Sequence, residues 1–304
     1  MTSEYPSVEV VIATHHRPVL VRKAIDSVLR QRYTGRLGVT VVFDGEEPDE
    51  RLGHDGPVPV RVLGNTRTPG LAGARNCGVA SSSAELVAFL DDDDEWLSGK
   101  LERQVARLLA EPGAEFATTA MRVEFQGHDS VRLAGTSHVT HERLIVSRMA
   151  MLHSSTFLIR RSALDAIGMV DETAPASQNE DWDLLLRSSR RHAIAHLDEP
   201  LVLVRWGSSS LFVSEWQSRI VAAEWILEQH PDVRSSAVGH ARLLGQIAFA
   251  HAALGHSRAA MASAVRASRL HWREPRGYLA MAVAAGFLSP TIILKLLHQR
   301  GHGI

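Results

Sequence analysis

Short apolar runs alternate with stretches of helical periodicity in the first part of the chain. Four short, mostly apolar runs predict buried strands, at residues 8–12, 39–43, 59–63 and 85–90. Apolar residues at helical spacing predict three helices, over residues 18–31, 71–80 and 96–109. The resulting order of strands and helices, β-α-β-β-α-β, predicts a largely parallel, doubly wound α/β sheet.

The same patterns continue with longer polar interruptions and then change to helices alone. Further on we expect a strand at 155–161, a short helix at 162–168 capped by Ser162 and ended by Gly168, a polar loop at 171–179, a helix at 182–191 and a strand at 197–205. From residue 214 onward only helices are predicted, over 215–229, 234–254, 256–270 and 278–287, with breaks at Pro231, Gly255 and Pro275. We therefore predict an α/β domain over residues 1–212 and a C-terminal α-helical appendage over 213–304.

The end of the appendage is the most apolar part of the chain. Residues 278–297 are nearly long enough to cross a bilayer, but Ser289 and Pro290 interrupt them, which favours two helices around a proline. We expect these helices to pack on the rest of the chain or on a second copy, and they are also candidates for peripheral membrane contact.

Four aspartates, Asp91 to Asp94, come directly after the strand predicted at 85–90. His15 follows the first strand and Asp44 the second, so these polar groups are expected at the carboxyl edge of the sheet, where doubly wound folds bind ligands. Carboxylates this close repel one another unless a cation neutralises them, and hard oxygen ligands suit Mg2+ or Mn2+. The alternative is a solvated acidic turn in which Asp94 or Glu95 caps the next helix.

Composition narrows the function classes. The 304 residues include 33 basic and 34 acidic side chains, and this near-zero net charge gives no argument for a nucleic-acid partner. The single cysteine, Cys77, leaves no internal disulfide and fits a reducing cytosol. The chain shows no signal-peptide pattern at its start, so a cytoplasmic location is expected.

The chain has no glycine-rich nucleotide-binding loop directly after a predicted strand, where such loops are normally found. The turn at 13–18 has none of the glycines that let a pyrophosphate approach the backbone, and no Gly-Lys-Ser/Thr loop is present. The glycines at 70–75 do not follow a strong strand. We therefore set aside a dinucleotide-binding oxidoreductase and a P-loop enzyme.

Five segments, in order, resemble the successive motifs of family 2 glycosyltransferases: residues 8–17, 41–45, 70–78, 90–96 and 179–187. The resemblance covers about residues 7–210. It implies a GT-A fold and an inverting enzyme that uses a nucleotide-sugar donor.

The resemblance implies a nucleotide site built from five residues. Asp44 matches the aspartate that reads the base edge, and His15 occupies a position where the family often stacks an aromatic residue on that base. Arg75 matches a basic residue near the nucleotide, and Asp91, together with Asp92, faces the ribose. An ionised Asp44 can accept from the imide N–H of uracil or thymine, which cytosine lacks. A plain turn at Asp44 and a surface arginine at position 75 are the alternatives.

The resemblance also implies a metal ligand and a catalytic base. Asp93 matches the metal-binding aspartate, and Asp181 matches the base, with Glu180 placed to orient the acceptor. A simple helix cap at Asp181 is the alternative. The family often has a metal-reaching histidine near the end of the next strand, where this chain has Arg205-Trp206-Gly207; His153 is a weaker substitute.

We therefore expect a cytoplasmic glycosyltransferase that moves a sugar from a UDP- or dTDP-sugar to an acceptor hydroxyl with Mn2+ or Mg2+. The acceptor is either lipid-linked or a small molecule, and a lipid-linked acceptor would place the enzyme at the inner face of the membrane. Two other functions stay open: a metal-dependent nucleotidyltransferase, and a non-catalytic helical interaction protein that keeps a remnant nucleotide-binding domain. The first usually has a basic, glycine-rich first turn, which this chain lacks.

Overall fold

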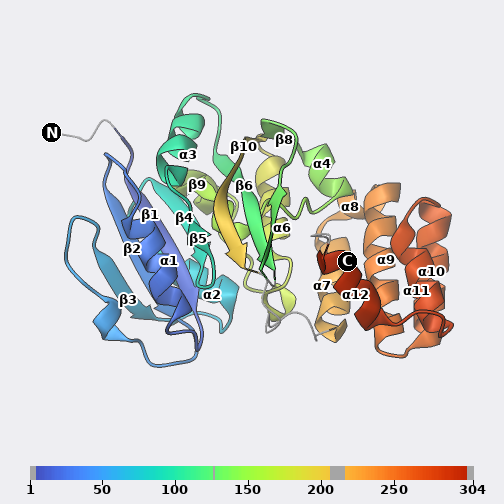
Figure 1. Cartoon of the computed structure of the whole chain (residues 1–304). Helices are drawn as coiled ribbons and strands as arrows, with labels where there is room; N and C mark the ends of the chain where they lie inside the picture. Colours follow the sequence, from blue (N-terminus) through green and yellow to red (C-terminus); the bar gives the residue numbers. More distant parts are fainter. Residues whose placement is uncertain (1–4, 126, 206–215, 300–304) are drawn as a thin grey trace.

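The computed structural model describes residues 5–125, 127–205 and 216–299. Figure 1 shows a central sheet covered by helices, followed by a group of helices at the C-terminal end of the chain. The predicted α/β class with a C-terminal helical region is therefore confirmed.

The sheet has ten strands, and its main path runs in the order β3-β2-β1-β4-β9-β6-β10-β5. Its first half is parallel and consists of β1 (Val8–Thr14), β2 (Leu37–Phe43), β3 (Val60–Gly64) and β4 (Leu86–Asp91). Its second half is mixed and consists of β5 (Glu95–Trp96), β6 (Phe116–Phe125), β9 (Leu158–Arg160) and β10 (Ile194–Arg205). Two further strands, β7 (His128–Arg132) and β8 (His138–Val139), pair with β6 and β10.

The register of the parallel strands brings their carboxyl ends to one edge. β1 is buried along its whole length, as its near-continuous apolar sequence predicts for a central parallel strand. Its Thr14 pairs with Phe43 of β2, and its Ala13 pairs with Asp91 of β4. The turn at 13–18, Asp44 and the four aspartates consequently start from neighbouring positions on the same edge.

Helices cover both faces of the sheet (Figure 1). One core contains apolar side chains of α1 (Leu20–Leu29) and α3 (Lys100–Leu109). The other contains those of α2 (Leu71–Ala80), α5 (Arg161–Ala166) and α6 (Glu180–Ser189). A Cβ atom at Gly78 would collide with Val11, so this glycine allows α2 to lie close to β1.

Four local predictions are wrong. The strand predicted at 155–161 is limited to Leu158–Arg160, because residues 154–156 form a 3-10 helix. Trp96 does not begin a helix: it lies in β5, and α3 starts only at Lys100, after Gly99 with a φ of +75°. Asp94 and Glu95 therefore cap no helix. Ser162 is inside α5, which begins one residue earlier, after Arg160.

The segment between α3 and β9 received no sequence prediction, although it supplies the long strand β6. It also contains β7, β8 and α4 (His141–Val146), and the 3-10 helix η2 (Ser154–Thr156) follows. Two more 3-10 helices are η1 (Glu50–Leu52) and η3 (Pro175–Ser177).

The C-terminal region is helical throughout its described residues. It consists of α7 (Trp216–Gln229), α8 (Pro231–Ser235), α9 (Ala237–Ala253), α10 (Ser257–Leu270), α11 (Pro275–Ala284) and α12 (Pro290–Gln299). The helix predicted at 234–254 is α9, which begins three residues later than predicted, and α8 is a separate short helix before it. The predicted break at Pro290 is confirmed. None of the helices in the described ranges is both long and apolar enough to cross a membrane.

Polar contacts join the helical region to the sheet region. His230 Nε2 lies 2.9 Å from Asp183 of α6, and Arg190 donates to Asp232 of α8 at 2.8 Å. α8 therefore packs on the sheet region. The helices for which packing was predicted, α11 and α12, bury Ala280, Val283 and Ile293 against α9 and α10, so they pack within the helical region. The predicted boundary between residues 212 and 213, like Trp206, Gly207 and the start of the predicted helix at Glu215, falls in 206–215, outside the described residues.

Candidate active site

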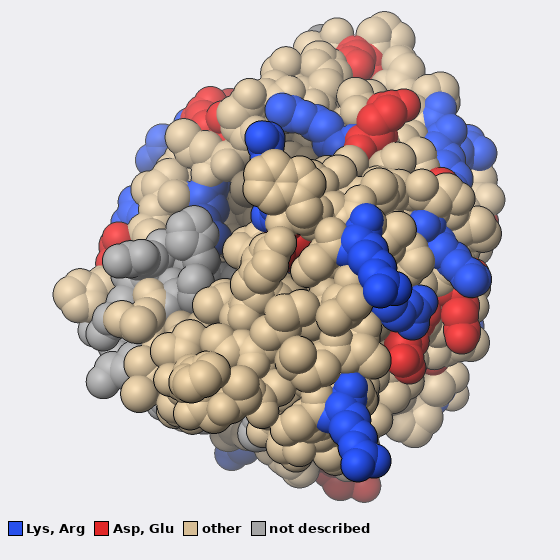
Figure 2. Space-filling view, turned by 90° about the vertical axis from the view of Figure 1, so that its right-hand side faces the viewer, with Lys and Arg blue, Asp and Glu red and all other residues tan. Residues whose placement is uncertain are grey.

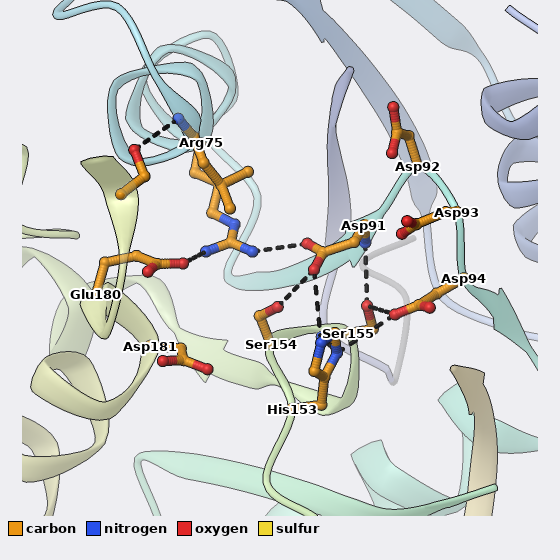
Figure 3. Close-up of polar contacts among 12 residues, drawn as sticks. Arg75, Asp91, Asp92, Asp93, Asp94, His153, Ser154, Ser155, Glu180 and Asp181 are labelled. Carbon is orange, nitrogen blue, oxygen red and sulfur yellow. Dashed lines mark hydrogen bonds and ion pairs between the residues drawn. The ribbon is translucent and has the colours of Figure 1, made fainter. Parts of the chain in front are cut away.

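The four aspartates form a tight turn at the end of β4, closed by the N–H of Asp94 donating to the Asp91 carbonyl at 3.1 Å. Their carboxylates separate into two pairs with different partners, and Figure 3 shows the contacts of Asp91 and Asp94. Asp91 and Asp94 lie near His153, whereas Asp92 and Asp93 share Arg17.

Asp91, Asp94 and His153 form the cluster best suited to a cation. Each offers one ligand atom, and these three atoms all lie within 4.8 Å of one another. Burial, together with the nearby charges of Asp93 and Asp91, raises the pKa of Asp94 well above its ordinary value. The two carboxylates are hard oxygen ligands of the kind that suits Mn2+ and Mg2+, and the His153 imidazole adds a nitrogen ligand, so the residues present fit a divalent cation.

Asp93 is not part of that cluster. Its carboxylate pairs with Arg17 at 2.7 Å, and the same guanidinium nitrogen lies 2.9 Å from Asp92. Asp92 also accepts from Thr14 Oγ1 at 2.8 Å, yet burial raises its pKa to about 6. The assignment of the metal to Asp93 stays a prediction, and Arg17 is a site residue that sequence reasoning did not single out.

Arg75 lies between the two acidic ends of the site (Figure 3). Its Nη2 donates to Asp91 Oδ1 at 2.6 Å and its Nη1 donates to Glu180 Oε1 at 2.8 Å. The side chain is only 3 % exposed and lies over the ring of Phe89. A surface arginine is therefore the wrong interpretation of this residue.

Glu180 and Asp181 open α6 and have opposite pKa shifts. Burial and the charge of Asp181 raise the pKa of Glu180 to about 7. Burial alone would raise the pKa of Asp181 as well, but the Arg148 guanidinium, 2.5 Å away, outweighs it and lowers the pKa. Asn179, in left-handed conformation, is the N-cap residue and makes no side-chain cap bond, whereas the Asp181 carboxylate accepts from the Trp182 N–H at 2.7 Å in the first turn of α6. Asp181 therefore also helps to hold the start of this helix. Two adjacent carboxyl groups are thus poised for different roles.

Asp44 and His15 lie together at the ends of β1 and β2. The Asp44 carboxylate accepts from Asn65 Nδ2 at 2.7 Å and from the Gly70 N–H at 2.9 Å, so it holds the loop that leads into α2. His15 Nδ1 lies 2.6 Å from the Asp44 carbonyl oxygen, and its side chain is exposed. The expected convergence of these residues on one edge is confirmed, while their roles toward a nucleotide stay predictions.

The contacts that sequence reasoning missed join distant segments. His153 and Arg148 lie on the loop between α4 and β9, which has no marked periodicity. Ser155 adds a hydroxyl that donates to Asp94 at 2.6 Å. Only the resemblance raised His153, as a weak substitute ligand, and no local pattern pointed to Arg148.

A mostly parallel sheet with an acidic turn at its carboxyl edge and a pair of carboxylates facing that turn fits a glycosyltransferase of the GT-A type. The family model described as "Glycosyl transferase family 2" matches residues 9–168, just over half of the chain. The chain belongs to this family and is a glycosyltransferase.

Curated relatives match parts of the chain. It is similar to the Escherichia coli UDP-Glc:alpha-D-GlcNAc-diphosphoundecaprenol beta-1,3-glucosyltransferase WfgD, with 30 % identity over 34 % of this chain and 41 % of that protein. A Campylobacter jejuni GalNAc(5)-diNAcBac-PP-undecaprenol beta-1,3-glucosyltransferase is 36 % identical over 32 % of each chain. The matches thus span less than half the length of these relatives.

Solved structures share the fold across nearly the whole chain. Staphylococcus aureus TarS in complex with UDP-GlcNAc has a TM-score of 0.61 at 16 % identity, covering 97 % of this chain and 92 % of that one. The mannosyltransferase PcManGT from Pyrobaculum calidifontis, in complex with GDP-Man and Mn2+, has a TM-score of 0.58 at 17 % identity, covering 95 % and 87 %. At this identity the likeness concerns the fold.

Proposed function

We propose that this glycosyltransferase is inverting and transfers a sugar from a UDP- or dTDP-sugar to an acceptor hydroxyl, with the help of a divalent cation. The observation that carries the proposal is the chain of contacts Asp91–Arg75–Glu180, which joins the acidic turn to the carboxylate pair. UDP-GlcNAc in the TarS complex and UDP-Glc in the name of the E. coli relative support a uridine donor.

The cation would be held by Asp91, Asp94 and His153, with Asp93 as the further ligand that the family resemblance implies. When bound, it would neutralise negative charge on the departing nucleoside diphosphate. The Mn2+ of the PcManGT complex supports Mn2+ as one candidate.

Asp181 would act as the base in a single in-line displacement. Its lowered pKa keeps it ionised at neutral pH, so it can accept the proton of the acceptor hydroxyl while that oxygen forms a bond to the anomeric carbon. The bond from that carbon to the diphosphate oxygen breaks on the opposite face, which inverts the configuration. Arg148 keeps Asp181 ionised but also weakens it as a base, so we propose that acceptor binding loosens this ion pair.

The acceptor is proposed to be a lipid-linked sugar or a small molecule. The names of the E. coli and C. jejuni relatives specify acceptors linked to undecaprenol through a diphosphate, which supports the first. We further propose a cytoplasmic enzyme with a GT-A domain over residues 1–212 and a helical region over 213–304. The family match favours glycosyl transfer over nucleotidyl transfer and over a non-catalytic remnant.

The test is a panel of nucleotides and nucleotide sugars, scored by thermal stabilisation with Mn2+ and with excess chelator. A donor that binds should raise the Tm, and one present at 100 times its Kd stabilises the protein by about 2.7 kcal/mol. The donor found is then offered to lipid-linked and soluble acceptors, and the anomeric configuration of the product is read by NMR. Stabilisation by nucleoside triphosphates alone would favour a nucleotidyltransferase instead.

A further inference from the structure

The end of the molecule formed by α10, α11 and α12 exposes an unusual amount of apolar surface. Nine of the fifteen exposed large apolar side chains in the described residues lie between positions 254 and 296. The most prominent surround the two turns that flank α11 or lie along α12: Trp272, Tyr278, Phe287, Leu288, Ile292 and Leu296. Phe287 is 83 % exposed and Trp272 is 66 % exposed, so neither is used to stabilise this fold. Large exposed apolar areas mark interaction surfaces.

The same end of the chain is strongly basic. Residues 255–299 include six Lys and Arg but only one acidic residue, Glu274, although the whole chain has a net charge of −1. Glu274 is buried and accepts from Arg276 at 2.7 Å, so it does not offset the charge of the surface. Figure 2 shows this end as a broad uncharged area crossed by Lys and Arg side chains, with Asp and Glu mostly at its margins.

Internal contacts fix how α10, α11 and α12 are arranged. Tyr278 Oη donates to the Trp272 carbonyl at 2.7 Å across the α10–α11 turn. Ser257 Oγ donates to the Ala284 carbonyl, which joins the start of α10 to the end of α11. Ile293 is buried in the core of the helical region, whereas its neighbour Ile292 is exposed. These contacts fix the turn between α10 and α11 and the face of α12 that enters the core, so Trp272, Tyr278 and Ile292 lie on the outer surface.

Basic and apolar groups are also interleaved rather than separated. The Arg273 guanidinium lies 4.8 Å from the centre of the Trp272 ring, and Arg258 and Arg269 are exposed on α10. Aromatic rings beside cations at the margin of an apolar area are typical of helices that lie in the interface of a membrane.

We propose that α10, α11 and α12 form a docking surface for an anionic lipid bilayer, on which the helices lie in the interfacial plane. The positive charge of this surface favours an anionic bilayer over a second copy of the chain as its partner, because two copies joined through this face would bring like charges together. A surface of anionic lipids instead attracts each arginine while the apolar groups enter the headgroup region. This surface is separate from the site of sugar transfer, so the proposal does not depend on the proposed chemistry.

The experiment is vesicle sedimentation of the full-length protein at low and high salt. Vesicles of equimolar phosphatidylglycerol and phosphatidylcholine should bind it, vesicles of phosphatidylcholine alone should bind it far less, and salt should weaken binding. The pair Phe287→Ser and Ile292→Ser should reduce partitioning roughly ten-fold or more. Replacing Arg258, Arg269 and Arg273 by Gln should reduce it roughly five-fold for each residue.

Matched controls lie on other faces. Leu133, 50 % exposed next to β7, is replaced by Ser, and Lys23, exposed on α1, is replaced by Gln; neither should change partitioning. Tm and nucleotide binding should be unchanged in all of these variants, because no replaced side chain is buried. The proposal is overturned if the native protein ignores both kinds of vesicle, or if the variants bind as tightly as the native protein. It is also overturned if light scattering shows a dimer that Phe287→Ser dissolves.

Discussion

The guanidinium of Arg75 donates to Glu180 at 2.8 Å, although the two residues lie 105 positions apart in the chain. Because Arg75 also donates to Asp91, one buried side chain joins the acidic turn at the end of β4 to the carboxylate pair at the start of α6. Burial excludes the water that would otherwise screen such contacts. The relative placement of the proposed donor and acceptor ends therefore depends on Arg75.

Replacing Arg75 by Gln should destabilise the protein by about 3–5 kcal/mol, because it leaves the buried Glu180 and the partly buried Asp91 without their shared guanidinium. The measurement is urea unfolding followed by circular dichroism. Arg67→Gln is the matched control: Arg67 pairs with Glu172 at a surface position, so its loss should cost no more than about 1 kcal/mol. If both variants lose a similar amount of unfolding free energy, the ion pairs of Arg75 contribute no more to stability than a surface ion pair does.

Asp94→Asn should weaken Mn2+ binding in the presence of UDP by at least the roughly ten-fold typical of altering even an outer-shell partner. The reason is that Asp94 shares a cluster with Asp91 and His153. Titration calorimetry gives the affinity. Asp93→Asn, measured in parallel, shows whether the cation is held by the cluster in the structure or by Asp93, as the sequence predicts. If Asp93→Asn alone abolishes binding, the cluster is not the cation site.

Asp44→Asn should reduce the preference for uridine and thymidine nucleotides over cytidine nucleotides, since an ionised carboxylate accepts from the imide N–H that cytosine lacks. Competition among UDP, dTDP, CDP and GDP measures the preference; guanine also has a ring N–H, so GDP is informative. Asn65→Ala is the control, because it removes one partner of Asp44 and leaves its charge. Unchanged discrimination in Asp44→Asn would show that Asp44 serves only to hold the loop.

Sequence patterns predicted the parallel half of the sheet because its strands are nearly uniformly apolar and end in conspicuous polar groups. They failed for β6, where Thr118, Thr119 and Arg122 interrupt the apolar residues. The buried Thr118 hydroxyl lies 2.8 Å from His196 Nδ1 of β10, and no local signal predicts that pairing. Trp96 was assigned to the following helix because an apolar residue at that spacing fits either element; its pairing with β10 decides the outcome.

The candidate site likewise contains residues that the sequence predicts and residues that it does not. The aspartates at 91–94 and the pair at 180–181 stand out in the sequence because acidic residues there follow a strand or precede a helix. Their partners do not stand out, because Arg148 and His153 reach them from an irregular loop. Their contacts are set by tertiary structure, which no periodicity records.

The raised pKa of Glu180 should make stability depend on pH. Its carboxyl group has a pKa of about 7 in the folded protein, against an ordinary value of 4.5, so the folded state holds the proton more tightly. Stability from this group is complete below about pH 4.5 and is lost as the pH rises through 7. Relative to Glu180→Gln, which does not titrate, the native protein should therefore become less stable between these values. Unfolding of both proteins across this range tests it, and parallel curves would contradict the raised pKa.

The last prediction concerns Asp181, on which the proposed mechanism depends. Asp181→Asn should lower the rate of transfer by roughly the hundred- to ten-thousand-fold typical of losing general base catalysis. Donor binding should survive, because the residues at the ends of β1, β2 and β4 are untouched. Glu180→Gln is the matched control and should lower transfer less if Glu180 only orients the acceptor. The base would instead be Glu180 if Asp181→Asn transfers at the native rate while Glu180→Gln is inactive. A product that retains the donor's anomeric configuration would contradict the single displacement for either carboxylate.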